Sequence, residues 1–252
     1  MAFKLLDGAT AIGASPSIKV GRGVINHTCD VKFTSLAATA ISALTVVLQG
    51  ASTNEHDLTG PITNPTLAIG STAEQWKTGT FYYRIAGTNY TKATVAAGVA
   101  FSAAHAVTAE KYGVVLCYIN AAGTVSTKVV STTQAYDSAA LAHAAADAYH
   151  LANYTSDLCY IGRILINAET GNDWNANTDD MTNASDLTTA TFLSEPITFM
   201  DLGTNAFAAG EITAQRAMWH VTDKSVKYVR MFVSALTGTG EIDGWYTPAT
   251  RV

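Results

Sequence analysis

The sequence predicts a mainly β protein, in which a β-sandwich is formed by the N- and C-terminal segments and an inserted, mostly β domain carries one helix. Two stretches far apart in the chain, 19–49 and 214–246, each read as a pair of strands around a turn. Neither stretch has enough strands to bury both faces of a sheet alone, so we expect the two to fold together. We predict a discontinuous sandwich domain from residues 1–70 and 195–252, and an inserted domain from residues 71–194.

The composition indicates a folded protein with little surface charge. The chain has 252 residues, of which 48% are hydrophobic and 14% charged, and its net charge is −5. This charge gives no general attraction to nucleic acid or anionic membranes, and no run approaches the ~20 apolar residues of a membrane span. The start, MAFKLLDGATAIGAS, lacks the apolar centre of a signal peptide. We expect no nucleic-acid or membrane partner, and a product made in a cytoplasm.

The three cysteines, Cys29, Cys117 and Cys159, are widely spaced, with no Cys-x-x-Cys and no Cys/His pair at zinc spacing. Their odd number argues against a full disulfide framework. Cys29 and Cys117 lie in apolar runs, where we expect them to be buried as small hydrophobic residues.

The N-terminal part of the chain predicts strands separated by turn-rich segments. Residues 1–18 combine a short apolar start with several turn residues, which indicates an edge strand or an arm. Strands are expected over 20–34 and 44–49, followed by a loop over 50–65 with Gly-Pro and Asn-Pro breakers. His56 and Asp57 are candidate binding residues in this loop, although we favour a solvated loop tip.

The inserted segment predicts a series of strands that begins with a hairpin at residue 81 and a turn at 87–89. One strand has two apolar faces and is expected to be central, with Val114, Leu116 and Tyr118 on one face and Val115, Cys117 and Ile119 on the other. Further strands are expected over 125–130, after a turn at 120–123, and over 158–167 and 188–193.

One helix is expected over 137–151, DSAALAHAAADAYHL, where alanine dominates and Asp137 or Ser138 can cap the first turn. Its inward stripe is expected to consist of Leu141, Ala144, Ala145, Ala148 and Leu151.

A second face of this helix carries His143, Asp147 and His150, the most metal-like group in the sequence. A single helix supplies only three ligands, and nothing else in the sequence points to a metal. We favour a polar face that is exposed to solvent or packed on a neighbouring subunit.

The polar loop over 171–186 carries Asp173, Asp179, Asp180 and Asp186. Its density of Asp and Asn resembles that of calcium loops, but the fixed Asp-x-Asp-x-Asp-Gly register and the closing Glu are absent. We favour a solvated loop.

Motifs for a catalytic serine, a zinc protease, a P-loop or a dinucleotide site are absent from the sequence. His27 and His220 enter strands at comparable places in the two outer stretches, where a partly buried histidine bonded to backbone is the simplest interpretation. Aromatic residues can line a sugar-binding face, although core packing uses the same residue types; the tryptophans are Trp76, Trp174, Trp219 and Trp245. We predict no catalytic, cofactor-binding or metal-binding residues.

Six segments carry a resemblance to a known class of protein. In the outer stretches they are KVGRG at 19–23, LTVVLQGAST at 44–53 and HVTDKSVKYVRMFVSALTGTG at 220–240. In the insert they are FYYRIAGTNYTKA at 81–93, GVVLCYINAAGTVSTK at 113–128 and IGRILIN at 161–167. These segments resemble virion structural proteins of tailed bacteriophages and prophages, over most of the chain. The resemblance rests on strand pattern rather than on catalytic motifs.

The resemblance implies a non-enzymatic capsid decoration (cement) protein that binds and stabilises the phage head, in a virion assembled in the host cytoplasm. Its expected partners are the major capsid protein or other virion proteins and further copies of the chain, with a trimer favoured because subunits join around closed axes. The alternatives are a head fibre, a neck or tail structural protein, or a carbohydrate-binding adhesion module on the virion. A further alternative is a hydrolase of cell-wall or capsule sugar, with Glu195, Glu211 and Asp201 near Trp219 as candidate carboxylates.

Overall fold

The computed structural model is mainly β, as the sequence predicts, and α1 (Ala139–Asn153) is the one helix among the residues that it describes. The chain divides into two compact units, residues 1–58 with 198–252 and residues 59–197, which we term the outer unit and the inserted unit. The residues described are 3–9, 13–15, 17–19, 27–34, 41–51, 59–95, 97–102, 104–153, 155–195, 200–208, 216–221, 228–238 and 241–248.

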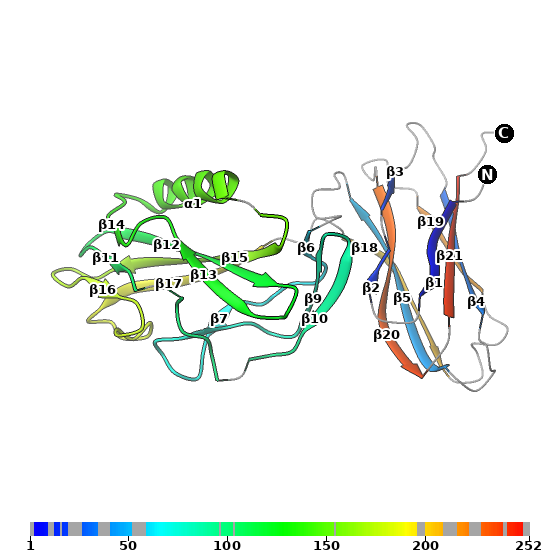
Figure 1. Ribbon diagram of the computed structural model, residues 1–252, viewed down its shortest axis with the longest axis horizontal. Coiled ribbons are helices and arrows are strands. Elements are labelled where there is room, and N and C mark those ends of the chain that lie inside the picture. The colour runs from blue at the N-terminus through cyan, green and yellow to red at the C-terminus, as the bar shows by residue number, and fades with distance from the viewer. Residues whose placement is uncertain are drawn as a thin grey trace. The chain divides into compact units, whose positions relative to one another are not determined.

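The outer unit is built from strands at both ends of the chain: β1 (Phe3–Ala9), β2 (Gly13–Ala14), β3 (Ile18–Lys19), β4 (His27–Thr34), β5 (Ile41–Ala51), β18 (Met200–Ala208), β19 (Arg216–Val221), β20 (Tyr228–Gly238) and β21 (Glu241–Pro248). One antiparallel sheet has the order β1-β21-β4-β19, and the other has the order β18-β5-β20-β2, with β3 also paired to β20. Figure 1 shows the two sheets as the layers of a sandwich.

Every strand pair of the outer unit joins one N-terminal strand to one C-terminal strand, within the described residues. The longest pairing runs between β5 and β20, from Ile41 opposite Gly238 to Ala51 opposite Tyr228. The two ends of the chain therefore complete each other's sheets.

Each of the two outer stretches was expected to be a pair of strands around a turn, but the second stretch contains three strands, and the strands of both stretches are divided between the two sheets. β4 pairs with β19 and β21, whereas β5 pairs with β18 and β20. The first stretch thus gives β4 to one layer and β5 to the other, whereas the second gives β19 and β21 to one layer and β20 to the other. Both stretches contribute to both layers, because the apolar faces of a sandwich oppose each other across the layers. Residues 1–18 were expected to form an edge strand or an arm. β1 is an edge strand, since it pairs with β21 at the end of its sheet.

The boundary between the units lies earlier than residue 70. Residues 60–61 form β6, and the side chains of Ile62 and Leu67 are buried. Leu67 belongs to the core of the inserted unit and its N–H donates to the hydroxyl of Ser194 at 3.0 Å. The end of the loop expected over 50–65 therefore belongs to the inserted unit. His56 and Asp57 lie outside the described residues.

The inserted unit contains α1 and the strands β6 (Gly60–Pro61), β7 (Ala68–Ile69), β8 (Trp76–Lys77), β9 (Phe81–Ile85), β10 (Thr88–Lys92), β11 (Ala106–Val107), β12 (Tyr112–Asn120), β13 (Val125–Val129), β14 (Thr133–Gln134), β15 (Leu158–Ala168), β16 (Trp174–Asn175) and β17 (Leu187–Ser194). Its main sheet has four strands in the order β13-β12-β15-β17, and smaller sheets have the orders β10-β9-β6, β14-β11-β16 and β7-β8.

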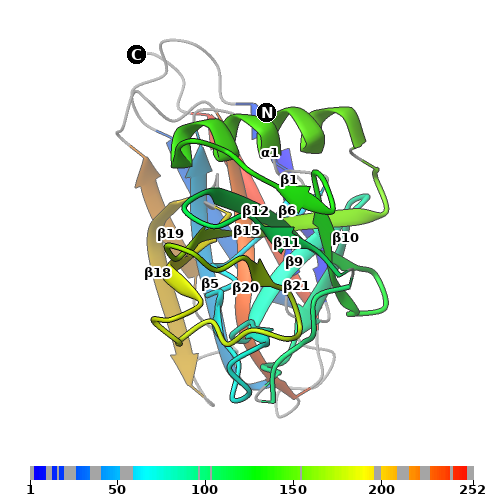
Figure 2. The ribbon, with the colours of Figure 1, turned by 90° about the vertical axis from the view of Figure 1, so that its left-hand side faces the viewer.

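β12 is central in the main sheet of the inserted unit, as predicted, and it is buried on both faces. Val115, Cys117 and Ile119 enter the larger core, whereas Leu116 and Tyr118 enter a smaller core under α1. Figures 1 and 2 both show α1 lying over β12 and β15.

The helix begins two residues later than expected, at Ala139. Ser138 is the cap, because its Oγ accepts the N–H of Leu141 at 3.3 Å. Asp137 instead binds the ammonium of Lys111 at 2.6 Å. The helix ends at Asn153, whose side-chain amide donates to the carbonyl of Tyr149 at 2.9 Å.

Candidate functional site

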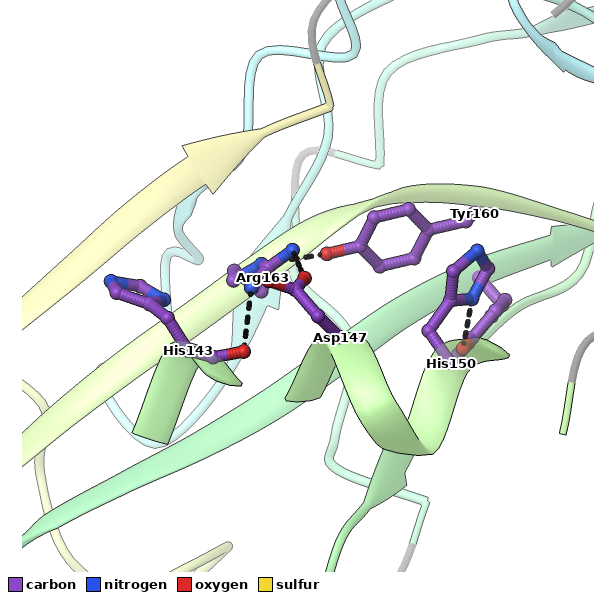
Figure 3. A network of polar contacts seen from close by, with 6 residues as sticks. His143, Asp147, His150, Tyr160 and Arg163 are labelled. Atoms are coloured by element: carbon purple, nitrogen blue, oxygen red, sulfur yellow. Dashed lines mark hydrogen bonds and ion pairs between the residues drawn. The ribbon is translucent and has the colours of Figure 1, made fainter. Parts of the chain in front are cut away.

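A cluster of polar and aromatic side chains lies between α1 and the main sheet (Figure 3). We term Tyr118, Asp147, His150, Tyr160 and Arg163 the α1 cluster. Tyr118 comes from β12, Tyr160 and Arg163 from β15, and Asp147 and His150 from α1. Ionisable groups that lie this close to one another are the first place to look for chemistry.

A β-bulge in β15 creates the cluster. Along a regular strand, residues three apart point to opposite faces. Here Cys117 lies opposite Gly162 and Tyr118 opposite Tyr160, so β15 has one extra residue between these pairs. The bulge turns Tyr160 and Arg163 to the same face, where the Nε of Arg163 donates to the Tyr160 hydroxyl at 2.9 Å.

Gly162 is required at this bulge. Its φ is +138°, in the range that side chains of L-residues rarely adopt. A β-carbon there would collide with the carbonyl oxygen of Leu193 on the neighbouring strand. The glycine therefore allows both the unusual backbone angle and the close approach of β17.

Arg163 is the hub of the cluster. Besides the bond to Tyr160, its Nη1 donates to the carbonyl of His143 at 3.3 Å and its Nη2 lies 2.5 Å from Oδ1 of Asp147. The side chain of Arg163 is 17% exposed and that of Asp147 is 64% exposed. Each of the three guanidinium nitrogens thus has a partner, and the arginine ties α1 to β15.

His150 packs on the aromatic rings of the sheet. Its ring centroid lies 4.6 Å from that of Tyr160, and its Nδ1 lies 2.9 Å from the Tyr118 hydroxyl. Partial burial lowers the pKa of His150, and the positive charge of Arg163 lowers it further against the opposing effect of Asp147. Burial also raises the pKa of both tyrosines. The ring is therefore neutral at pH 7 and can accept the Tyr118 proton in its hydrogen bond.

The contacts of the α1 cluster tie the helix to the sheet. Asp147, whose side chain is exposed, is ion-paired with Arg163. Tyr118 and Tyr160 stay protonated at pH 7, because burial raises the pKa of both hydroxyls. The cluster holds the last two turns of α1 against the sheet.

The cluster reverses the predicted orientation of α1. The helix buries Ala142 and Ala146, whereas Leu141 and Leu151, expected to face inward, are 53% and 83% exposed. The predicted stripe is wrong because the sheet under the helix presents Tyr118 and Tyr160, whose bulk leaves room only for alanine and for the flat ring of His150.

The outer face of α1 consequently carries a row of apolar residues beside the exposed Asp147. Leu141, Ala144, Ala148 and Leu151 are all exposed and follow one another at spacings of three, four and three residues. These are the a and d positions of a heptad, which form a single seam along a helix. We term these residues the α1 seam. A contiguous exposed apolar patch marks a surface that packs against another protein.

The cysteines that the structure describes are inert. Cys117 and Cys159 are free and buried, and burial raises the pKa of both thiols. The expectation of burial is confirmed for Cys117, and the side chain of Cys29 lies outside the described residues.

The aspartates of the polar loop bond to their own surroundings. Asp173 accepts the N–H of Ala109 at 2.9 Å, and Asp180 accepts the N–H of Thr182 at 2.6 Å. Asp179 accepts the N–H of Asn175, and Asp186 accepts the side-chain amide of Asn183. Among the residues described, no group of three His, Cys, Asp or Glu is arranged to hold a metal. That the protein binds no metal stays a prediction.

Two of the four tryptophans are core residues rather than a sugar-binding platform, since Trp76 and Trp174 are fully buried. For Trp219 and Trp245, as for His27, His220 and Asp201, the structure describes only the backbone. In that backbone, His220 lies opposite Thr28, one position from the pair of His27 with Val221. Glu211 lies outside the described residues.

Sequence reasoning identified the helix residues of the α1 cluster but missed Tyr118, Tyr160 and Arg163 as their partners. A signal was present, because Gly162 interrupts the apolar strand LCYIGRILIN and a glycine inside a strand indicates a bulge.

Comparison with known proteins finds no matching family model, no matching curated protein and no matching solved structure. In the part of the chain that is described, no helix is long and apolar enough to cross a membrane.

Proposed function

We propose that the protein is a non-enzymatic structural component of a bacteriophage particle, a capsid decoration protein that binds and stabilises the head surface. The proposal starts from the resemblance of its strand segments to virion proteins. A chain made largely of strands, with its described cysteines buried, fits such a role. Neck or tail components share these properties, so the position in the particle is part of what the experiment must establish.

The observation that carries the proposal is the α1 seam. A helix normally turns its leucines toward the core, whereas here Leu141 and Leu151 face outward and alanines face inward. The contacts of the α1 cluster fix the rotation of the helix about its axis, and this keeps Leu141 and Leu151 away from the core. An interface with another subunit would remove this apolar surface from water.

The proposed occupant of the α1 seam is another copy of the chain in a homo-oligomer, with a trimer favoured. One helix face is too small for a stable contact, since specific interfaces bury roughly 1,200–2,000 Å² in total. Additional surface of the particle lattice would supply the remainder. The seam itself carries no charge and the neighbouring Asp147 is paired with Arg163, so the contact should change little with salt.

The decisive experiment asks where the protein is found and what the α1 seam does. Purified virions should contain the chain in many copies, as judged by mass spectrometry and a particle map. The variants Leu141→Glu and Leu151→Glu should lower the oligomer mass in light scattering and weaken incorporation, without unfolding the protein. Leu202→Glu is the matched control, because Leu202 is an exposed leucine outside α1, at 37%. A soluble monomer that is absent from virions would contradict the proposal.

A further inference from the structure

β17 forms an open edge of the main sheet in the inserted unit. It pairs with β15 on one side, and no strand in the described part of the chain pairs with its other side. An edge strand presents a row of main-chain N–H and C=O groups that can accept another strand. β17 is eight residues long, which is enough for a substantial strand pairing.

β17 differs from the other edge strands in charge. Proteins protect their sheet edges with charged residues, especially lysine, or by covering them. The other described edge strands of five residues or more each carry at least one charge, namely Lys4 and Asp7 in β1, Lys92 in β10, Lys128 in β13, Asp201 in β18 and Arg216 in β19. β17 reads LTTATFLS and carries none.

The opposite edge of the same sheet, β13, is also covered by a neighbouring segment at Ser102. The N–H of Thr127 in β13 donates to the hydroxyl of Ser102 at 2.9 Å, and the N–H of Ser102 donates to the hydroxyl of Thr127 at 2.8 Å. One edge of the main sheet is thus both charged and covered. The other is uncharged and has no paired strand in the described part of the chain, although the hydroxyl of Ser194 at its end accepts the N–H of Leu67.

The side chains of β17 suit an added strand. Thr189, Thr191 and Leu193 are exposed on one face, and Phe192 is half-buried on the other. β-branched and aromatic residues are those that pair best across neighbouring strands.

We propose that β17 is a docking edge that receives an extended, uncharged segment of another protein, flanked by Lys or Arg, as an added strand. Charge complementarity identifies this occupant, because Asp186 precedes β17 and Glu195 follows it, both half-exposed. A second copy of β17 fits less well, since antiparallel pairing in register would place Asp186 of one copy against Glu195 of the other. The inference does not depend on a role in a phage particle.

The test uses the full-length protein, isotopically labelled, and the capped peptide Lys-Thr-Val-Thr-Val-Thr-Lys. The peptide should slow hydrogen exchange at the β17 amides and shift their NMR signals. The same peptide with Glu at both ends should bind more weakly by roughly 2–5-fold for each charge. A version N-methylated at every backbone amide should not bind, because neither of its edges can then donate main-chain hydrogen bonds. Absence of any effect at β17, or equal binding of the methylated peptide, would overturn the proposal.

Two variants separate the edge from its flanking charges. Thr191→Lys should abolish binding of both peptides, whereas Thr132→Lys, at an exposed position outside the strands, should leave binding unchanged. Asp186→Asn with Glu195→Gln should remove the preference for the Lys-flanked peptide. Unchanged binding to Thr191→Lys, or an unchanged preference in the double variant, would contradict the proposal. A dimer cross-linked through β17 that excludes the peptide would identify a second copy as the occupant and overturn it as well.

Discussion

Gly162 is the residue on which the α1 cluster depends. Its positive φ allows the bulge in β15, and the bulge brings Tyr160 and Arg163 to the face that α1 covers. Arg163 then binds Asp147 and the carbonyl of His143 in the helix. A local backbone feature thus determines which side chains can meet.

We expect Gly162→Ala to cost about 2–5 kcal/mol of unfolding free energy, because backbone strain and a steric collision add at this site. Gly171→Ala is the control, since Gly171 also has a positive φ, +84°, but its β-carbon would meet nothing within 4 Å. The control should cost about 1 kcal/mol. Urea unfolding of the two variants measures the difference, and equal costs would contradict the role of Gly162 in admitting β17.

The pKa of His150 predicts how stability depends on pH. Partial burial and the charge of Arg163 lower the pKa of the folded histidine below its ordinary value of 6.5, against the effect of Asp147. The unfolded chain therefore binds the proton more readily, so the contribution of His150 is present above pH ~6.5 and is lost as pH falls through the folded pKa.

We expect the melting temperature to fall more between pH 7.5 and pH 5 in the wild type than in His150→Phe. The variant keeps a ring against Tyr160 but cannot titrate. Thermal unfolding followed by circular dichroism measures the difference. The same pH dependence in both proteins would show that another group is responsible.

At the scale of elements, α1 shows why a helix can be predicted while its orientation is not. Leucines define the apolar stripe in the sequence, yet Ala142 and Ala146 are the residues with no exposed surface. Small residues let the helix axis approach β12, where Tyr118 and Tyr160 already fill the space. The leucines remain outside and form the α1 seam.

This orientation gives a testable contrast between two alanines of the same helix. Ala146→Leu should destabilise the protein by about 1–3 kcal/mol, because added methylene groups overpack a filled core. Ala144→Leu, on the exposed face, should change stability by less than about 0.5 kcal/mol. Chemical denaturation of both variants checks this, and the opposite order of costs would support the orientation expected from the sequence.

At the scale of the whole molecule, the insertion divides a unit whose two halves need each other. Every described strand pair of the outer unit links the two ends of the chain, whereas both core clusters of the inserted unit come from within residues 59–197. The inserted unit is thus built from one continuous segment, whereas the outer unit must bring together segments far apart in sequence. Independent folding of the two units stays a prediction.

We expect residues 59–197 to fold when expressed alone, since their apolar side chains are buried against one another. Residues 1–58 joined to 198–252 by a Gly/Ser linker should form a folded β protein. Neither outer half should fold alone, because neither contains a strand pair of its own among the described residues. Circular dichroism and NMR dispersion of the four fragments test this. A folded outer half, or an unfolded joined fragment, would contradict it.

The sequence by itself determined where most strands and the helix lie, because alternation and two-sided apolar runs record which side chains are buried. It identified β12 as central and the two ends of the chain as parts of one sandwich. The tertiary structure decided which strand lies beside which, which face of α1 is inward, and where Arg163 points. Those outcomes depend on contacts between residues distant in sequence, such as Gly162 with Leu193 or His150 with Tyr118. A local pattern shows that a residue is buried, but the packing around it determines its partner.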